Sequence, residues 1–182
     1  GLPQNRERLF IVGIHQSAVP AGWTGYFFPQ EKAPSAVVQD VMDNHIKANV
    51  SGKVIEILCD EPTVETGCLV EVGRIDGRNA QGYREYSPMG LGATLTATGG
   101  GYGPTSVYAV NGNARTLTPR EACRMQGLPE WAIHHPVKTH ACRHAGNGVA
   151  IPVVQELVRP LAEIFRSPVK PTRSIRVVGG AA

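Results

Sequence analysis

Two arginines, Arg6 and Arg8, stand two residues apart just before a short apolar run at residues 9–12. In an extended chain, side chains at this spacing lie on the same face, so both guanidinium groups would point in one direction. Planar guanidinium groups bind phosphates, carboxylates and the edges of bases through paired hydrogen bonds. A solvated basic turn would have the same spacing, so the pair indicates an anion or nucleic-acid site only together with its neighbours.

A second stretch that could contact nucleic acid lies in the middle of the chain. Residues 81–87 read Gln-Gly-Tyr-Arg-Glu-Tyr-Ser, and residues 93–101 carry three threonines and end in three glycines. Because glycine has no side chain, such a segment lets the backbone approach a phosphate closely. Taken alone, however, the stretch fits a glycine-rich surface hairpin better than a binding loop.

Histidine and cysteine side chains gather before the C-terminal helix, and this raises the question of a zinc site. Their spacing matches no zinc finger and no catalytic zinc pattern. We therefore predict no metal site among them. The side chains are His134, His135, His140, Cys142 and His144.

The composition sets only loose limits on function. The chain has 182 residues, a formal net charge of +3 and a pI near 8.8, which is compatible with a nucleic-acid partner and with many other proteins. Its four cysteines lie far apart without CxxC spacing, as is typical of reduced thiols in the cytoplasm. No run of 18 apolar residues occurs, so we predict no membrane-spanning segment.

Local patterns predict short elements in the first quarter of the chain. The apolar run at residues 9–14 indicates a buried strand. Residues 15–34 are rich in glycine and proline and are expected to form a loop. Ser35 is expected to cap a short helix over residues 36–46.

The middle of the chain combines predicted strands with one clear helix start. The apolar runs at residues 54–58 and 69–72 predict strands, and residues 73–103 have the composition of a surface loop. Thr118 begins the sequence Thr-Pro-Arg-Glu, a capping box with proline at the first helical position. This helix is expected to end at Gly127.

The C-terminal region predicts one amphipathic helix followed by a tail. Asn147, in the sequence Gly-Asn-Gly, is expected to cap a helix over residues 150–165, with Pro152 tolerated in its first turn. The tail after Arg166 is rich in proline, arginine and glycine and is expected to be disordered. An apolar stripe at helical spacing consists of Val154, Leu157, Val158, Leu161 and Phe165.

Three segments of the chain resemble, in the same order, the eighth, ninth and tenth sequence blocks of the DNA cytosine-5 methyltransferases. These segments are residues 3–8 (Pro-Gln-Asn-Arg-Glu-Arg), residues 115–129 and residues 146–154. The resemblance extends from Gly1 to about Phe165. It implies that the chain is the C-terminal half of such an enzyme and that it begins inside a motif.

The resemblance implies a mixed α/β fold. Residues 1–14 would supply a strand and a loop to a Rossmann-like, S-adenosylmethionine-dependent methyltransferase domain. Residues 15–117 would form an irregular, mostly β target-recognition domain. Residues 118–166 would return as helices to the catalytic domain, and residues 167–182 would be the disordered tail.

The same resemblance assigns roles to the basic string and to the turn before the last helix. Arg8 would contact a cytosine flipped out of double-stranded DNA, because an enzyme cannot reach the ring carbons of a stacked base. Arg6 and Gln4 would hold this loop and its neighbours. Asn147 and Gly148 would lie against the cofactor, S-adenosyl-L-methionine.

DNA recognition is assigned to the middle of the chain, which is similar to the recognition loops of family members that modify GCGC sites. Gln81 would fill the gap left by the flipped cytosine, and Arg84 would read a guanine, the commonest direct contact of arginine. Thr98 stands where those members have an aromatic residue, so the target sequence stays open. The other DNA-contacting residues would be Thr96, Thr98, Gly99, Gly100 and Gly101.

Parts of the family's active site do not occur in the sequence. No cysteine follows a proline, as the family's nucleophile does, and neither Glu-Asn-Val nor Phe-x-Gly-x-Gly is present. Because a thiolate must add to C6 of cytosine before C5 accepts a methyl group, we predict that the chain is inactive without the missing N-terminal half. The chain could thus be part of a methyltransferase polypeptide, a subunit of a split methyltransferase, or a catalytically dead DNA-binding module.

Overall fold

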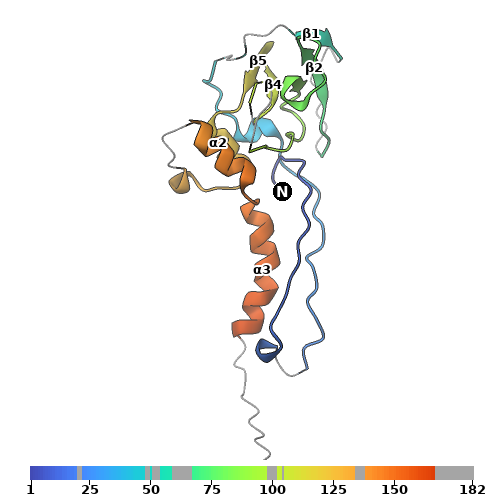
Figure 1. Ribbon diagram of the computed structural model, residues 1–182, viewed down its shortest axis with the longest axis vertical. Helices are drawn as coiled ribbons and strands as arrows, with labels where there is room; N and C mark the ends of the chain where they lie inside the picture. The colour runs from blue at the N-terminus through green and yellow to red at the C-terminus, as the bar shows by residue number, and fades with distance from the viewer. Residues whose placement is uncertain are drawn as a thin grey trace, which may run out of the picture.

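The computed structural model describes residues 1–19, 22–47, 50, 54–58, 67–97, 102–103, 105–133 and 138–166. These residues form a body around one sheet and an extension in which helix α3 (Ile151–Arg166) runs away from the body (Figure 1). The chain on either side of the short helix η1 (Gln16–Ala18) runs alongside α3. The Tyr26 hydroxyl donates to the carbonyl oxygen of Leu157 in α3 at 2.7 Å, which joins the two parts of the extension.

The body contains a five-stranded sheet with the order β1-β2-β3-β4-β5. Neighbouring strands pair antiparallel except β3 and β4, which are parallel. The turn between β4 and β5 uses Asn111 at φ 52° and Gly112 at φ 71°, a left-handed pair that suits a tight hairpin. The strands are β1 (Val54–Ile57), β2 (Glu71–Ile75), β3 (Arg84–Tyr86), β4 (Val107–Val110) and β5 (Asn113–Thr116).

One hydrophobic core joins the sheet to the helical elements of the body. Tyr108 and Leu117 are fully buried in it, together with Val38 and Met125. A Cβ atom at Gly92 would overlap the end of the Met125 side chain, so a larger residue here would require the buried Met125 side chain to shift. The helical elements are η2 (Val38–Val41), η3 (Gln81–Tyr83), α1 (Pro119–Met125), η4 (Glu130–Ala132) and α2 (Lys138–Asn147).

The predicted start and end of α1 are confirmed. The Thr118 hydroxyl accepts a hydrogen bond from the Glu121 amide at 3.2 Å, and the Glu121 carboxylate accepts one from the Thr118 amide at 2.7 Å. Pro119 is the first helical residue, and Gly127 has φ 74° just after the helix. The left-handed conformation of Gly127 ends the helix as expected.

Two predictions for the N-terminal region are wrong. Residues 9–14 form no strand, and Leu9 and Ile11 are 86% and 87% exposed, because no strand edge in the described part of the chain lies beside them. The helix predicted over residues 36–46 is reduced to the single turn of η2. Ser35 does not cap it, since its hydroxyl accepts a hydrogen bond from the N-terminal amine of Gly1 at 3.2 Å.

The predicted surface loop at residues 73–103 is also wrong, because this region holds part of the sheet and of the core. Strand β3 lies within it, and Tyr86, Leu91, Ala93 and Leu95 are almost fully buried. The last three alternate along the chain, which is the pattern of a segment with one buried face. Strand β1 matches its prediction to within one residue, whereas β2 begins two residues later than predicted and extends to Ile75.

The last two helices differ from the prediction in how they begin. Helix α2 was not predicted, and Asn147 is its final residue, so Asn147 does not cap α3. The α3 helix begins at Ile151, whose amide donates to the carbonyl oxygen of Gln126 at 2.9 Å. Pro152 lies in its first turn, as expected. The predicted disordered tail lies outside the described residues.

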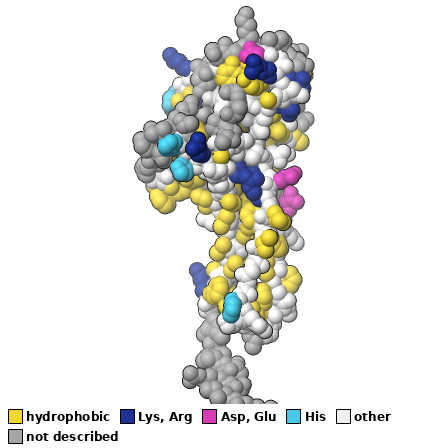
Figure 2. Space-filling model, in the orientation of Figure 1, with side chains coloured by type: hydrophobic (Ala, Val, Ile, Leu, Met, Phe, Trp, Pro, Cys, Tyr) yellow, Lys and Arg dark blue, Asp and Glu magenta, His cyan; other side chains and the backbone are white. Residues whose placement is uncertain are grey.

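The apolar stripe of α3 is largely uncovered. No residue of this helix is fully buried, and Val154, Val158 and Phe165 are 39%, 48% and 65% exposed. Hydrophobic side chains accordingly line much of the extension seen in Figure 2. Among the described residues, no helix is long and apolar enough to cross a membrane.

Candidate functional site

The basic string at the N-terminus lies in a parallel arrangement beside residues 92–95. Gln4 forms a parallel bridge with Gly92. The Gly92 amide donates to Pro3 O at 2.8 Å, and the Asn5 amide donates to Gly92 O at 2.9 Å. The two segments are about 90 residues apart in the sequence, so this pairing brings the basic string against the segment predicted to contact DNA.

Arg6 joins three segments of the chain through main-chain oxygen atoms. Its Nη1 donates to Leu95 O at 2.9 Å, and its Nη2 donates to Gly146 O at 2.7 Å and to Gly148 O at 2.9 Å. Burial, and after it the charge of Arg8, lowers the pKa of Arg6, but an arginine stays protonated at neutral pH. Arg6 therefore connects the middle of the chain with the turn between α2 and α3.

A hollow of about 200 Å³ lies beside this connection and is lined by the rest of the basic string. Arg6, Arg8 and Lys32 give its wall a positive charge, and Arg8 is exposed, with a hydrogen bond from its Nη1 to Glu7 O. Gln4 also lines it, and both polar atoms of the Gln4 amide are buried without a hydrogen-bond partner. Such an amide is costly to leave unpaired. The charged side chains of the hollow therefore offer cationic donors to a polar or anionic group.

The two residues predicted to read DNA line a second hollow, of about 360 Å³. Gln81 Nε2 donates to Thr94 O at 3.0 Å. Arg84 Nε donates to Asn79 O at 2.9 Å, and its Nη1 lies 3.6 Å from a carboxylate oxygen of Glu71. Both side chains are thus held in defined positions at the start of the central strand β3.

The same hollow contains two polar residues that the sequence patterns did not single out. Thr94 and Asn5 both line it, and the Thr94 hydroxyl donates to Asn5 O at 2.6 Å. The alternation of apolar Ala93 and Leu95 with threonine at position 94 was the sequence signal that could have found Thr94. Asn5 had no comparable signal, because its contacts depend on a segment far away in the sequence.

The turn between α2 and α3 holds the two residues predicted to approach a cofactor. Asn147 is exposed, whereas Gly148 is half-buried and its carbonyl oxygen accepts from Arg6. A Cβ atom at the preceding Gly146 would overlap the backbone of Thr96, so this glycine lets α2 and the Thr96 segment touch. Of the other predicted DNA contacts, Thr98, Gly99, Gly100 and Gly101 lie outside the described residues.

The cysteines of the described residues do not line either hollow. Cys123 and Cys142 are buried, and burial raises the pKa of the Cys123 thiol, which disfavours its nucleophilic thiolate form. His134, His135 and Cys59 lie outside the described residues. Within the described ranges no three histidine, cysteine or acidic side chains are grouped to hold a metal ion.

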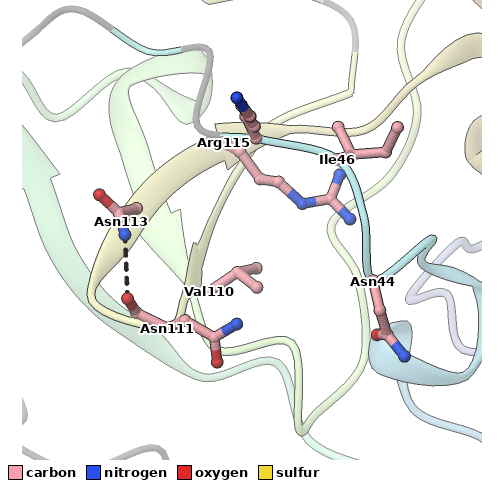
Figure 3. Close-up of a pocket in the computed structure, with 7 residues that line it drawn as sticks. Asn44, Ile46, Val110, Asn111, Asn113 and Arg115 are labelled. Carbon is pink, nitrogen blue, oxygen red and sulfur yellow. Dashed lines mark hydrogen bonds between the residues drawn. The ribbon is translucent and has the colours of Figure 1, made fainter.

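A third hollow, of about 280 Å³, lies between the β4–β5 turn and residues 44–47 (Figure 3). Asn113 Nδ2 donates to Asn111 O there at 2.9 Å. Arg115 reaches its wall from β5, but the Glu121 carboxylate binds both terminal nitrogens of Arg115, at 3.0 and 2.8 Å. The residues that line it include none of the predicted site residues. It is separate from the two hollows that the basic string connects.

Comparison with known proteins assigns the class of protein that this arrangement represents. A family model for C-5 cytosine-specific DNA methylases matches residues 1–163. The chain therefore belongs to the C-5 cytosine-specific DNA methylase family.

Individual relatives agree with this family. The chain is 31% identical to the type II methyltransferase M.HhaI of Haemophilus parahaemolyticus, over 85% of this chain and 47% of that protein. It is 29% identical to M1.ScrFI of Lactococcus lactis subsp. cremoris, over 91% of this chain and 41% of that protein. A crystal structure of the S. pombe Dnmt2 methyltransferase aligns with a TM-score of 0.46 and 17% identity, over 75% of this chain and 45% of that chain. The chain spans about half the length of the curated relatives it matches.

Proposed function

We propose that the chain is the C-terminal portion of a DNA (cytosine-5)-methyltransferase, which binds target DNA and holds a flipped cytosine for methylation. The observation that carries this proposal is the position of Arg6, which joins the segment at Leu95 to the turn at Gly146 and Gly148. Arg6 lines the hollow that also contains Gln4 and Arg8, and its neighbour Asn5 lines the hollow that contains Gln81 and Arg84. A base-flipping enzyme needs its base-holding and sequence-reading groups in such a fixed relation.

In this proposal Arg8 contacts the flipped cytosine. Arg8 is exposed and its guanidinium forms no salt bridge with an acidic side chain of the described residues, so its N–H groups are available to the oxygen and nitrogen atoms on the edge of a base. Gln4 and Arg6 hold the string that carries Arg8. Arg6 does so through three carbonyl oxygens, and Gln4 through its place in the bridge with Gly92.

Sequence reading is proposed for Gln81 and Arg84, with Thr94 and Thr96 beside them. The Gln81 side chain lies at the hollow's edge, where it can enter the space that a flipped base leaves. Arg84 is oriented by Asn79 and Glu71, which reduces the number of positions its guanidinium can take on a guanine. The glycines at positions 99–101 would accept the DNA backbone.

The turn at Asn147 and Gly148 fits the amino-acid end of S-adenosyl-L-methionine. The exposed amide of Asn147 has both a donor and an acceptor, as a group carrying an ammonium and a carboxylate requires. When bound, this cofactor supplies the methyl group. The contribution of the chain itself is to orient the Asn147 amide, because Arg6 fixes the main-chain oxygens on either side of it.

The nucleophile is proposed to lie in an N-terminal catalytic half that the chain must contact. Two features support this: the uncovered apolar stripe of α3 and the exposed side chains of Leu9 and Ile11. Contact with a second half would remove these apolar side chains from water, which is favourable. The same surface favours a methyltransferase half or a split subunit over a self-sufficient DNA-binding module, because such a module has no use for it.

The experiment that tests this function is methyl transfer with and without that half. The chain is incubated with duplex DNA and labelled S-adenosyl-L-methionine, alone and with a catalytic half that carries the Pro-Cys nucleophile. We expect no 5-methylcytosine from the chain alone and methylation when both parts are present. Methylation by the chain alone would show that the active site has been assigned wrongly, and sequence-specific DNA binding without any restored transfer would favour the binding module.

A further inference from the structure

Three side chains beside the proposed reading residues form a compact cluster that no role above explains. The ring centroids of Tyr83 and Tyr102 are 5.8 Å apart, with the ring planes at 72°, an edge-to-face arrangement that aromatic rings favour. The Cζ atom of Arg78 lies 4.8 Å from the centroid of the Tyr83 ring, and Arg78 Nη1 donates to the Tyr83 hydroxyl at 2.9 Å. We call these three residues the tyrosine clasp.

The tyrosine clasp connects two segments that are separate in the sequence. Tyr83 belongs to η3, whose first residue is Gln81 and which runs directly into Arg84 of β3. Tyr102 follows the glycine-rich stretch, and its amide donates to Gly82 O at 3.1 Å. A ring contact and a main-chain hydrogen bond thus fix Tyr102 to the centre of the turn that carries both reading residues.

The turn itself is held from within at several points. The Tyr83 amide donates to Ala80 O at 2.8 Å, and the Arg78 amide donates to Ile75 O at 3.1 Å. Arg84 Nε donates to Asn79 O. A base-reading side chain on a pre-formed turn loses less conformational freedom when it binds a base. The rigidity of this turn should therefore increase the discrimination between bases.

We propose that the tyrosine clasp is a positioning device that sets sequence discrimination, by fixing η3 and the segment at Tyr102 in one arrangement. The inference rests on the proposed reading of DNA by Gln81 and Arg84. Because the clasp residues contact one another, their loss acts on the placement of base-reading side chains and leaves phosphate contacts in place. Phosphate contacts supply most of the non-specific affinity, whereas base contacts supply specificity.

The test measures sequence discrimination and non-specific binding separately. The 182-residue chain is used to select duplexes from a random pool, and the ratio of its affinity for the selected site to its affinity for singly substituted sites is determined. Tyr102→Ala is expected to lower this ratio about 2- to 10-fold, the range expected for one aromatic pair, with non-specific affinity unchanged. Tyr102→Phe keeps the ring pair and is expected to keep the ratio.

Two further variants separate positioning from loss of fold. Tyr83→Phe keeps both rings but removes the hydrogen bond from Arg78, and is expected to lower the ratio less than Tyr102→Ala. Tyr26→Ala is the matched control, since it removes another edge-to-face pair, with Phe28 at 5.0 Å, in the extension. It is expected to leave the ratio unchanged.

Several outcomes would overturn the proposal. An unchanged ratio in Tyr102→Ala would do so, as would an equal loss in Tyr26→Ala. If Arg78→Gln lowers the dependence of binding on salt, Arg78 is a phosphate contact and not part of a positioning device. A wild-type chain that selects no sequence would overturn the proposed function and this inference with it. Selection that is relaxed at one guanine by Arg84→Ala, but unaffected by Tyr102→Ala, would leave the function standing and reject the clasp alone.

Discussion

Glu121 is a fully buried residue whose carboxylate accepts four hydrogen bonds. Its two carboxylate oxygens accept hydrogen bonds from both terminal nitrogens of Arg115 and from the amides of Thr118 and Asp43. Burial acts to raise the pKa of Glu121, but the Arg115 side chain and the two amides outweigh it, so the pKa lies below its usual value. The ionised form is therefore the one that the fold stabilises.

The effect of pH follows from the direction of this shift. A carboxyl group whose pKa is lowered by folding contributes stability above its unfolded pKa, and this contribution is lost as the pH falls through the folded value. Glu121→Gln is expected to cost about 3–5 kcal/mol of unfolding free energy at pH 7, because it leaves Arg115 buried without its counter-charge. Urea denaturation at pH 7 and at pH 3 measures the unfolding free energy of the wild-type chain and of the variant.

The control for this experiment is Glu130→Gln. Glu130 also binds two arginines, Arg120 and Arg124, but on the surface, where ion pairs add little stability. We expect little change in unfolding free energy for this variant. A loss as large as that of Glu121→Gln would mean that burial is not what makes the Glu121 pair important.

A second prediction at the residue scale concerns Arg8. In the complete enzyme, Arg8→Ala is expected to lower turnover on the order of 100-fold, the usual cost of removing one hydrogen-bond donor at a reacting group, with a smaller effect on DNA affinity. Arg120→Ala removes an exposed arginine elsewhere and should change neither. Single-turnover rates and DNA dissociation constants distinguish the cases, and a loss confined to DNA affinity would make Arg8 a plain phosphate contact.

At the scale of elements, local sequence patterns predicted those features whose contacts lie between residues close together in the sequence. The capping box at Thr118 was predictable because its hydrogen bonds join residues three positions apart. The burial of Leu91, Ala93 and Leu95 was not, since the basic string that pairs beside them lies about 90 residues away. Helix α2 was missed because its sequence is mostly polar and lacks a clear apolar stripe.

The candidate site also contains residues that the sequence predicted and residues that only the structure revealed. Arg6, Arg8, Gln81 and Arg84 were singled out by residue type and by resemblance. The structure puts Arg6 and Arg8 at one hollow and Gln81 and Arg84 at another. The roles of Thr94 and of the three acceptors of Arg6 could be found only in the tertiary structure. Every residue has a main-chain oxygen, so the sequence does not indicate which ones bind Arg6.

The prediction at this scale concerns α3. Each large side chain left in water forgoes about 1.5–3 kcal/mol of burial, so α3 is expected to be less stable than α1 in the chain alone. Hydrogen exchange should show fast exchange over residues 151–166 and slow exchange over residues 119–125. Adding the catalytic half should protect α3, whereas strong protection in a monomer would contradict the proposed docking surface.

At the scale of the whole molecule, the two proposed tasks occupy different regions. The reading residues and the tyrosine clasp lie in the body, and the uncovered apolar side chains lie mainly in the extension (Figures 1 and 2). Distant substitutions without shared partners usually have additive effects. The effects of variants in the clasp and of variants on α3 should therefore add, unless a variant also disturbs Arg6, which binds the body and the turn that leads into α3.

The contacts of Arg6 also bear on how such a protein can change its target over evolutionary time. All three groups that Arg6 binds are main-chain oxygens, so the joint places no demand on the side chains at positions 95 and 148. Mutations that give the proposed reading segment a new preference can accumulate while its contact with the proposed base-holding string persists. Among the three residues whose oxygens Arg6 binds, Gly146 is excluded from such drift, because any side chain there would collide with the backbone of Thr96.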